Sequence, residues 1–271
     1  MSPSDQQAEG KRSWSKPPMI GDKKTRWSLY AGVILYALWA IWSIDVDIPR
    51  LLEGVVYANE FFASALTPDF VTRWHDIWTG FAESLVMTAV STTVGVALSI
   101  PVGLGAASNL ATRPVYLICR AILAISRAFH ALILAILFVA MFGFGPFAGF
   151  VTLVVATVGF LGKLIAEDIE AINWDSVEAI ESTGASWLQK VVYGVAPQIM
   201  PRLIGLSLYR VDINFRESAI IGIVGAGGIG ATLLTAFERY EFSSVSAILI
   251  LIIGIVYAFE VLSGVIRRKV M

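Results

Sequence analysis

The sequence predicts an all-α integral membrane protein with about six transmembrane helices. Hydrophobic residues make up 56% of the 271 residues and charged residues only 15%, and the mean hydropathy is +0.73. A soluble globular domain carries about 25% charged residues. The apolar runs are long enough, at roughly 18 residues or more, to cross a hydrocarbon layer of about 30 Å. Basic residues gather in alternate connectors, as the positive-inside rule requires.

The amino-terminal part is expected to form a tail and a first membrane anchor. Residues 1–26 are polar, with six basic residues against three acids, and they predict a disordered cytoplasmic tail. Residues 27–44 predict a transmembrane anchor. A cleaved signal peptide is the alternative, but no clear A-x-A cleavage site follows Trp39 and Trp42. Residues 45–81 are mainly acidic, so we expect an extracytoplasmic connector there.

Five further apolar spans are expected in the core, which covers residues 82–266. The spans are residues 83–107, 121–142, 147–166, 203–224 and 245–265. Arg113 and Arg120 place the first connector of the core on the cytoplasmic side, and Gly143 and Gly145 predict a tight turn outside. The basic cluster near the end predicts a cytoplasmic tail over residues 267–271. Both termini are therefore expected inside the cell.

A long polar segment separates the third and fourth spans of the core. We expect two short helices in it, joined at Gly184, because a positive φ at this glycine would end the first helix. Asp175 is expected to cap the first helix, and Ser186 is expected to cap the second together with Gln189. Pro197 is expected to end the second helix. Such a pair of helices would project from the membrane domain as a rigid knob.

The fourth span of the core is unusual because it carries charged residues near its middle. Four central charges cost about 3 kcal/mol each on the insertion scale, whereas its eleven Leu, Ile, Val and Phe residues favour insertion by only about 0.5 kcal/mol each. The segment must therefore face protein, a partner charge or a water-filled path. Asp212 and Arg216 can pair along one helix face, and Arg210, Asn214 and Glu217 share a neighbouring face. Two interpretations stay open, a translocation path and a structural pair or dimer interface.

A glycine-rich segment follows this span. Gly225, Gly227, Gly228 and Gly230 formally match the dinucleotide-binding pattern G-x-G-x-x-G. That fingerprint requires a preceding strand and a following helix, whereas this segment follows a membrane helix and is expected outside the cytoplasm. We therefore expect flexible backbone and close helix packing at a gate.

Composition and motifs argue against several classes of function. The net charge is −1, so no nucleic-acid partner is expected. Cys119 is the single cysteine, and His75 and His130 are the two histidines, so neither a disulfide nor a metal site is expected. The sequence has no catalytic constellation and no P-loop. The chain is therefore not expected to be an enzyme or to bind a cofactor, and a partner must hydrolyse any ATP.

The polar segment also carries the motif of a known family. Its spacing resembles the EAA loop of binding-protein-dependent ABC importer permeases. The matching positions are Glu178, Ala179, Gly184, Ala185, Ser186 and Pro197. Ile180 stands at the third position of the motif, and Ala196 stands where the family usually has Leu. The resemblance implies that residues 168–197 form a cytoplasmic coupling loop that docks on an ATPase subunit.

Further motifs are similar to the phosphonate branch of this family, and together they extend over about residues 80–270. They comprise runs within residues 142–149, 162–167, 183–186 and 209–216, and the glycine-rich segment. One departure concerns the start of the second core span. Such permeases commonly have an arginine followed by Ile-Pro and an acid, whereas here Ala128, Phe129 and His130 follow Arg127.

The resemblance implies a type I ABC importer permease fold in the cytoplasmic (inner) membrane of a prokaryote. It implies translocation of phosphonate or a related phosphorus oxyanion by alternating access, driven by a dimer of ABC ATPase subunits. It further implies an extracytoplasmic phosphonate-binding protein and a second permease copy in a homodimer. Arg210 and Arg216 are expected to attract the passing anion. The alternative is a permease for another small solute, such as an amino acid or an osmoprotectant.

Overall fold

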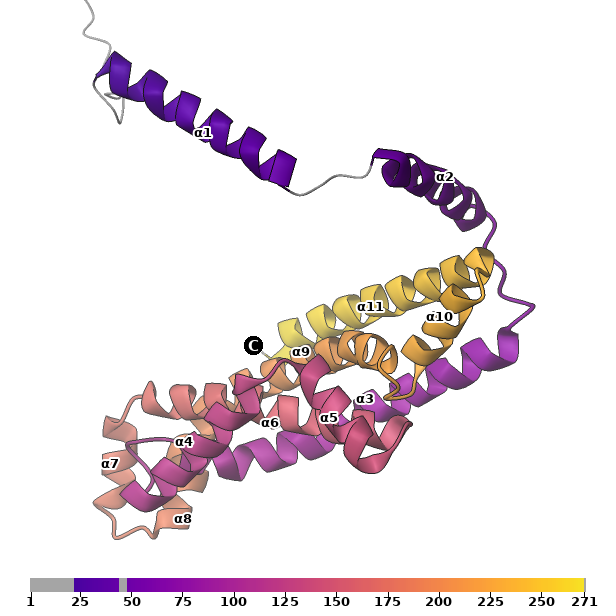
Figure 1. Cartoon of the computed structure of the whole chain (residues 1–271). Helices are drawn as coiled ribbons and strands as arrows, with labels where there is room; N and C mark the ends of the chain where they lie inside the picture. Colours follow the sequence, from indigo (N-terminus) through magenta and orange to yellow (C-terminus); the bar gives the residue numbers. More distant parts are fainter. Residues whose placement is uncertain (1–21, 44–47, 271) are drawn as a thin grey trace, which may run out of the picture. The chain divides into compact units, whose positions relative to one another are not determined.

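The computed structural model describes residues 22–43 and 48–270 and divides into two units. The first unit, Met1–Asn59, contains helix α1 (Lys23–Ser43) and the first part of α2 (Ile48–Ala65). The second unit, Glu60–Met271, contains the remaining elements. All regular elements in the described residues are helices (Figure 1), so the predicted all-α class is confirmed.

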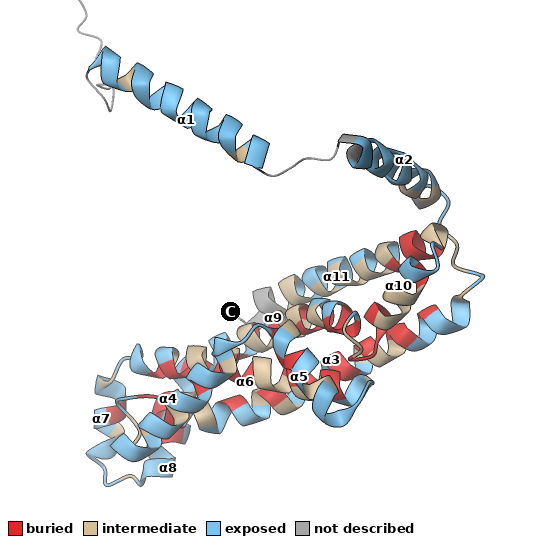
Figure 2. Ribbon diagram, viewed as in Figure 1, coloured by how far each residue is buried: buried red, intermediate tan, exposed pale blue. Residues whose placement is uncertain are grey.

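Helix α1 coincides with most of the predicted anchor over residues 27–44. It begins after Asp22, whose carboxylate accepts hydrogen bonds from the Lys24 N–H at 3.2 Å and from the Thr25 hydroxyl at 3.0 Å. These bonds satisfy donors that the first helical turn leaves free. Figure 2 shows α1 exposed along almost its whole length. The predicted tail over residues 1–26 lies mostly outside the described residues.

The second unit consists of long helices joined by short connectors. A polar elbow, residues 182–186 between α7 and α8, interrupts this pattern near one end of the unit. The elements are α3 (Trp74–Gly105), α4 (Arg113–Ala128), α5 (Ala131–Phe142), α6 (Pro146–Glu170), α7 (Asp175–Glu181), α8 (Trp187–Gln189), the π-helical segment η2 (Lys190–Val195), α9 (Ala196–Gly222), α10 (Ile229–Glu238) and α11 (Phe242–Val270).

Length and composition mark candidate membrane spans among the described helices. Four helical stretches in the described residues are long and apolar enough to cross a membrane: α3, α6, the continuous stretch Trp187–Gly222 and Phe242–Ile266 in α11. A fifth span exists if α4 and α5, which are bent by 94°, act as one broken span. Helix α1 is not among them, since its aromatic residues and basic start lower its hydropathy. Among the described residues, length and composition thus support four or five of the roughly six expected spans.

The predicted span over residues 121–142 is broken near its middle. Phe129 has φ −113° and ψ 138°, and His130 has φ −66° and ψ 146°, so both residues are extended. The His130 Nδ1 then accepts a hydrogen bond from the Leu132 N–H at 3.3 Å at the start of α5. No proline or glycine marks this break in the sequence, and it was therefore not predicted.

The expected connectors contain more helix than the sequence suggested. The connector over residues 45–81 holds α2 and the beginning of α3, which starts at Trp74 instead of near residue 83. Helix α10 occupies most of the connector before α11. Helix α11 itself continues through residues 267–270, where a tail was expected.

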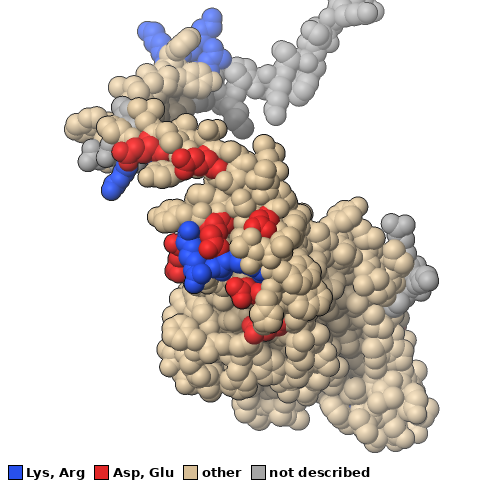
Figure 3. Space-filling model, turned by 90° about the vertical axis from the view of Figure 1, so that its right-hand side faces the viewer, with Lys and Arg blue, Asp and Glu red and all other residues tan. Residues whose placement is uncertain are grey.

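Charged residues gather near the start of α3 and the short connector between α10 and α11. Arg73 pairs with Glu241 at 2.5 Å and lies 3.8 Å from Asp76. Figure 3 shows basic and acidic side chains side by side on one face, with uncharged surface around them. Before α3, the Thr72 hydroxyl donates to Asp69, and this bond is the main cause of the lowered pKa of the Asp69 carboxyl.

Small residues let α3 and α6 approach closely. A Cβ atom at Gly95 would lie 2.6 Å from the Thr157 side chain, and one at Gly103 would lie 2.6 Å from the Ile165 side chain. Close approach through small residues is the usual packing mode of membrane helices. Helix α9 packs against both α3 and α6, and α11 packs against α9. The three helices α3, α6 and α9 thus enclose the interior of the second unit (Figure 1).

Candidate functional site

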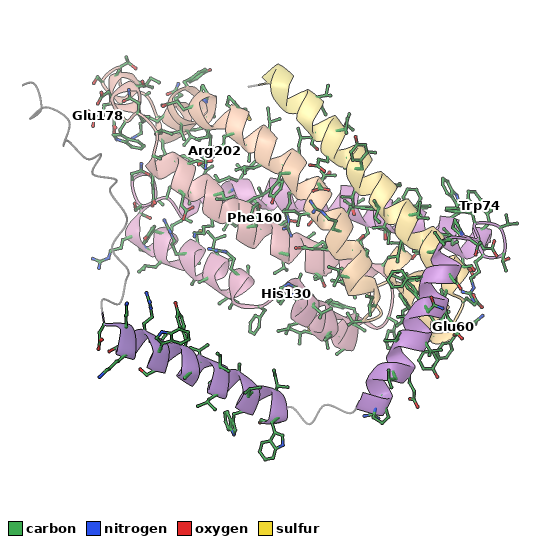
Figure 4. The ribbon with its side chains drawn as sticks, turned by 90° about the horizontal axis from the view of Figure 1, so that it is seen from above. Glu60, Trp74, His130, Phe160, Glu178 and Arg202 are labelled. Atoms are coloured by element: carbon green, nitrogen blue, oxygen red, sulfur yellow. The ribbon has the colours of Figure 1, made fainter. Side chains whose placement is uncertain are left out.

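The elbow between α7 and α8 lies at one end of the second unit. Figure 4 places Glu178 at this end and Trp74 at the opposite end of the helices. Glu178, Ala179, Gly184 and Ser186 are exposed, and Ala185 is half-buried. The family motif is therefore displayed on a surface that a partner protein can reach.

Local hydrogen bonds give the elbow its shape. Gly184 has φ +82°, as predicted for the residue that ends the first helix. The Ser186 N–H donates to Gln189 Oε1 at 2.8 Å, and the two residues form the predicted capping box. Lys190 Nζ lies 2.8 Å from Glu181 Oε1, so an ion pair closes the elbow from the other side.

Two details of the elbow differ from the prediction. Asp175 is the first residue of α7 and not its cap, because the preceding Asn173 Oδ1 accepts the Asp175 N–H at 3.0 Å. Pro197 does not end the second helix, because α8, η2 and α9 form one continuous helical stretch to Gly222. The π-helical segment ends two residues before the proline, and Pro197 is the second residue of α9.

A buried polar cluster joins α3, α6 and α9 in the interior. Arg210 is 3% exposed and Asn214 is 0% exposed. Asn214 Nδ2 donates to Thr92 Oγ1 at 2.8 Å and to Thr157 Oγ1 at 3.0 Å. Arg210 Nε donates to the same Thr157 hydroxyl oxygen at 3.1 Å. One threonine on α6 thus receives hydrogen bonds from two side chains of α9.

The charge of Arg210 is compensated within the second unit. Its Nη2 lies 3.0 Å from Glu217 Oε2, so the two residues that were predicted to share a face form an ion pair. The guanidinium also lies over the Phe160 ring, 5.5 Å from its centroid. Figure 4 shows Phe160 in the middle of the bundle. Arg210 thus joins α9 to α6 through Thr157 and Phe160, while its charge is paired within α9 by Glu217.

The second predicted pair, Asp212 and Arg216, is more exposed to solvent than the pair of Arg210 and Glu217. The two side chains form the expected ion pair one turn apart. The Arg216 side chain is 51% exposed, whereas Asp212 is buried and its Oδ1 has no hydrogen-bond partner. Both residues line a cavity of about 430 Å³ between α9 and α11. Glu260 and Ser263 of α11 line the same cavity.

The glycine-rich segment forms a tight connection between α9 and α10. Gly225, Gly227 and Gly228 have φ values of +90°, +77° and +76°, a region that residues with a Cβ rarely adopt. The Gly228 N–H donates to Glu83 Oε2 at 3.0 Å. A Cβ atom at Gly230 would lie 2.0 Å from the backbone oxygen of Ala219. The segment follows a helix, which argues against a dinucleotide fingerprint.

Four polar residues of these sites were not predicted. Thr92 and Thr157 were overlooked because nothing in a single sequence distinguishes them from other small residues of a membrane helix. Glu260 carried a signal, since an acid within an apolar run marks a buried or functional position. Glu83 was expected only as the first residue of a span, and the sequence indicated no partner for it. In the structure it accepts a hydrogen bond from the Gly228 N–H of the glycine-rich segment.

Residues 99–271 match the sequence profile of the family described as binding-protein-dependent transport system inner membrane component. The chain belongs to this family. The match confirms the predicted resemblance and makes the chain a membrane transport component, not an enzyme. The matched region contains the elbow, the α6 and α9 residues of the buried polar cluster, and the glycine-rich segment.

Two sequence relatives of this family member carry names that include a transported anion. The chain is 38% identical over 256 residues to the phosphate-import permease protein PhnE of Mycolicibacterium smegmatis; the match covers 94% of this chain and 48% of that protein. The chain therefore spans about half of that relative. It is 34% identical over 238 residues to the phosphite transport system permease protein PtxC of Stutzerimonas stutzeri, with 88% and 86% covered.

The fold has a solved counterpart. The structure resembles that of an inward-facing MetNI methionine ABC transporter with a TM-score of 0.62 and 26% identity, covering 72% of this chain and 94% of that chain. The predicted type I ABC importer permease fold is therefore confirmed, with four or five apolar spans among the described residues.

Proposed function

We propose that the chain is the transmembrane permease subunit of an ATP-driven importer for phosphonate, phosphite or phosphate. The names of the two sequence relatives support this substrate class. An anionic substrate is also compatible with two arginines in the span formed by α9, since charges in such segments mark substrate or ion pathways.

The observation that carries the proposal is the partly exposed ion pair of Asp212 and Arg216, which lines the cavity between α9 and α11. Arg210 is buried and bonded to Thr157 of α6 and Glu217 of α9, so its proposed role is to join α6 and α9. Arg216 is half-exposed beside a cavity that also contains Glu260. A passing phosphorus oxyanion would compete with Asp212 for the Arg216 guanidinium. Arg216 is therefore the proposed contact of the translocation path.

The exposed elbow is the proposed docking site for one subunit of an ABC ATPase dimer. ATP-driven closure of that dimer would move the elbow and expose the path alternately to the two sides of the membrane. The elbow would then face the cytoplasm, as would both termini. The opposite end of the unit, near Trp74, would face an extracytoplasmic binding protein that delivers the substrate.

A second permease copy is proposed to complete the path as a homodimer. The support is physical, because Arg216 and Glu260 are charged residues with exposed surface in membrane-spanning segments and need cover from protein or water. A twofold axis is the commonest arrangement of such pairs. The glycine-rich segment is the proposed gate. It connects α9 to α10 through glycines with positive φ, and its Gly228 N–H bonds to Glu83 of α3, so it links these three helices.

Uptake measurements test this proposal. Cells that express the chain with its ATPase and binding protein should accumulate radiolabelled phosphonate, phosphite or phosphate. Arg216→Gln should reduce uptake strongly, whereas Arg239→Gln, a change at an exposed arginine of the connector after α10, should not. Accumulation of labelled methionine but of none of the three anions would contradict the substrate class and favour an amino-acid permease, which the structural likeness to the methionine transporter also permits.

A further inference from the structure

The start of α9 is a weak point in the helix that leads from the elbow into the interior. Pro197 and Pro201 have no N–H, so the carbonyl groups four residues earlier, at Tyr193 and Pro197, lose their usual helical donors. The preceding segment, Lys190–Val195, is π-helical. Motion of the elbow must therefore pass through a helical stretch with an incomplete hydrogen-bond ladder before it reaches the polar cluster.

The residue after the first proline binds the chain just before α7. Gln198 Oε1 accepts the Asn173 N–H at 3.1 Å, and its Nε2 donates to the Asn173 carbonyl at 3.2 Å. The same Nε2 donates to the Gly194 carbonyl at 2.8 Å. One side-chain amide thus binds both backbone groups of Asn173 and also holds its own helix. Asn173 in turn accepts the Asp175 N–H at the start of α7.

The residue after the second proline makes a parallel contact one helical turn later. Arg202 Nε lies 3.0 Å from Asp168 Oδ1 in the last turn of α6, and the Asp168 side chain is largely buried. Figure 4 shows Arg202 between Glu178 and Phe160 along the bundle. Both contacts therefore fasten the start of α9 to residues 168–173, which connect α6 to α7.

We infer that Gln198 and Arg202 are positioning residues for energy coupling, which make the elbow and α9 move as one body. The inference rests on the proposed docking of the elbow to an ATPase. Each proline removes a hydrogen bond within the helix, and the contact of the residue after it, to Asn173 or to Asp168, stabilises the helix in its place. Without these contacts the elbow would follow the ATPase while α9 lagged behind, and ATP would be hydrolysed without transport.

The first test measures uptake of phosphonate, phosphite or phosphate per ATP hydrolysed by the assembled complex. Gln198→Leu should lower this ratio by about fivefold, the effect of losing hydrogen bonds worth about 1 kcal/mol. Arg202→Gln should lower it less, because the Arg202 side chain is 64% exposed and water screens its ion pair. Lys163→Gln is the matched control, because the Lys163–Glu167 pair at 3.1 Å lies within α6 and joins no second element. An unchanged ratio in the double variant of Gln198 and Arg202 would overturn the inference.

A charge exchange separates coupling from simple damage. Asp168→Arg combined with Arg202→Asp keeps an ion pair between α6 and α9 and should restore most of the ratio that Arg202→Gln loses. All variants should still copurify with the ATPase, because none changes the exposed elbow. Failure of the exchange to recover any coupling, in a complex that assembles normally, would contradict the pairwise role.

A spectroscopic measurement distinguishes this inference from the proposed substrate. Spin labels at Ser176→Cys, an exposed position of α7 outside the motif, and at Ile204→Cys, with Cys119→Ala as background, report the distance between α7 and α9. The distance distribution should stay narrow through the ATP cycle in the parent chain and broaden in Gln198→Leu. This readout needs no transported anion, so it stands even if uptake of all three anions fails. A narrow distribution in the double Gln198 and Arg202 variant would overturn the inference.

Discussion

The hydrogen bond between Asn214 and Thr92 provides a sharp test of the packing in the interior. Asn214 is fully buried, and its amide donates to threonines on two neighbouring helices. Thr92→Val removes one acceptor at nearly constant volume. The neighbouring Thr93 is exposed, and its hydroxyl donates only to the Ala89 carbonyl of its own helix at 2.8 Å. Thr93→Val is therefore a matched control.

The magnitude follows from measured side-chain hydrogen bonds in membrane proteins, which average about 0.6 kcal/mol and reach about 1.7 kcal/mol. Asn214→Leu removes two such bonds and should lower stability by about 1–2 kcal/mol, or the melting temperature by about 4 °C for a unit of this size. In a double-mutant cycle, Asn214→Leu and Thr92→Val should couple by about 0.6 kcal/mol.

Thermal unfolding of the purified chain in detergent, followed by tryptophan fluorescence, supplies the four melting temperatures of each cycle. The cycle with Thr93→Val should show no coupling, because Thr93 does not reach Asn214. Equal losses for Thr92→Val and Thr93→Val, or additive effects of Asn214→Leu and Thr92→Val, would refute the placement of α3 against α9.

Three further predictions concern other parts of the second unit. Gly230→Ala should lower the melting temperature strongly, because its Cβ would lie 2.0 Å from a backbone oxygen, whereas Gly254→Ala, with nothing within 4 Å, should leave it unchanged. Gly184→Val should weaken copurification with the ATPase without unfolding the core, since its strain of about 1 kcal/mol is confined to the elbow. Arg210→Gln should lower the melting temperature, because it leaves the partly buried Glu217 without its ion-pair partner.

Local chemistry made the elbow predictable. Gly184 and the pair Ser186 and Gln189 act through contacts within a few residues, so spacing alone identified the turn and the second cap. The pairing of charges in α9 was predictable for the same reason, because Asp212 and Arg216 lie one helical turn apart.

Contacts between distant segments explain the predictions that failed. The sequence marks Pro197 as a helix end, yet the helix continues from the π-helical segment through Pro197 to Gly222, and Gln198 bonds to the distant Asn173. The break at Phe129 has no local signal, because no proline or glycine marks it; the helices on its two sides, α4 and α5, both pack against α6. Thr157 is visible as a partner of α9 only after α6 is placed beside it.

ATP-driven uptake by the purified complex tests the central claim most directly. The chain, its ATPase and its binding protein would be reconstituted in lipid vesicles, with ATP on the side of the elbow and radiolabelled phosphonate, phosphite or phosphate on the other side. The account predicts accumulation of at least one of these anions that needs hydrolysable ATP and is lost in Arg216→Gln. Accumulation that is independent of ATP, or a coupled complex that carries none of the three anions, would contradict it.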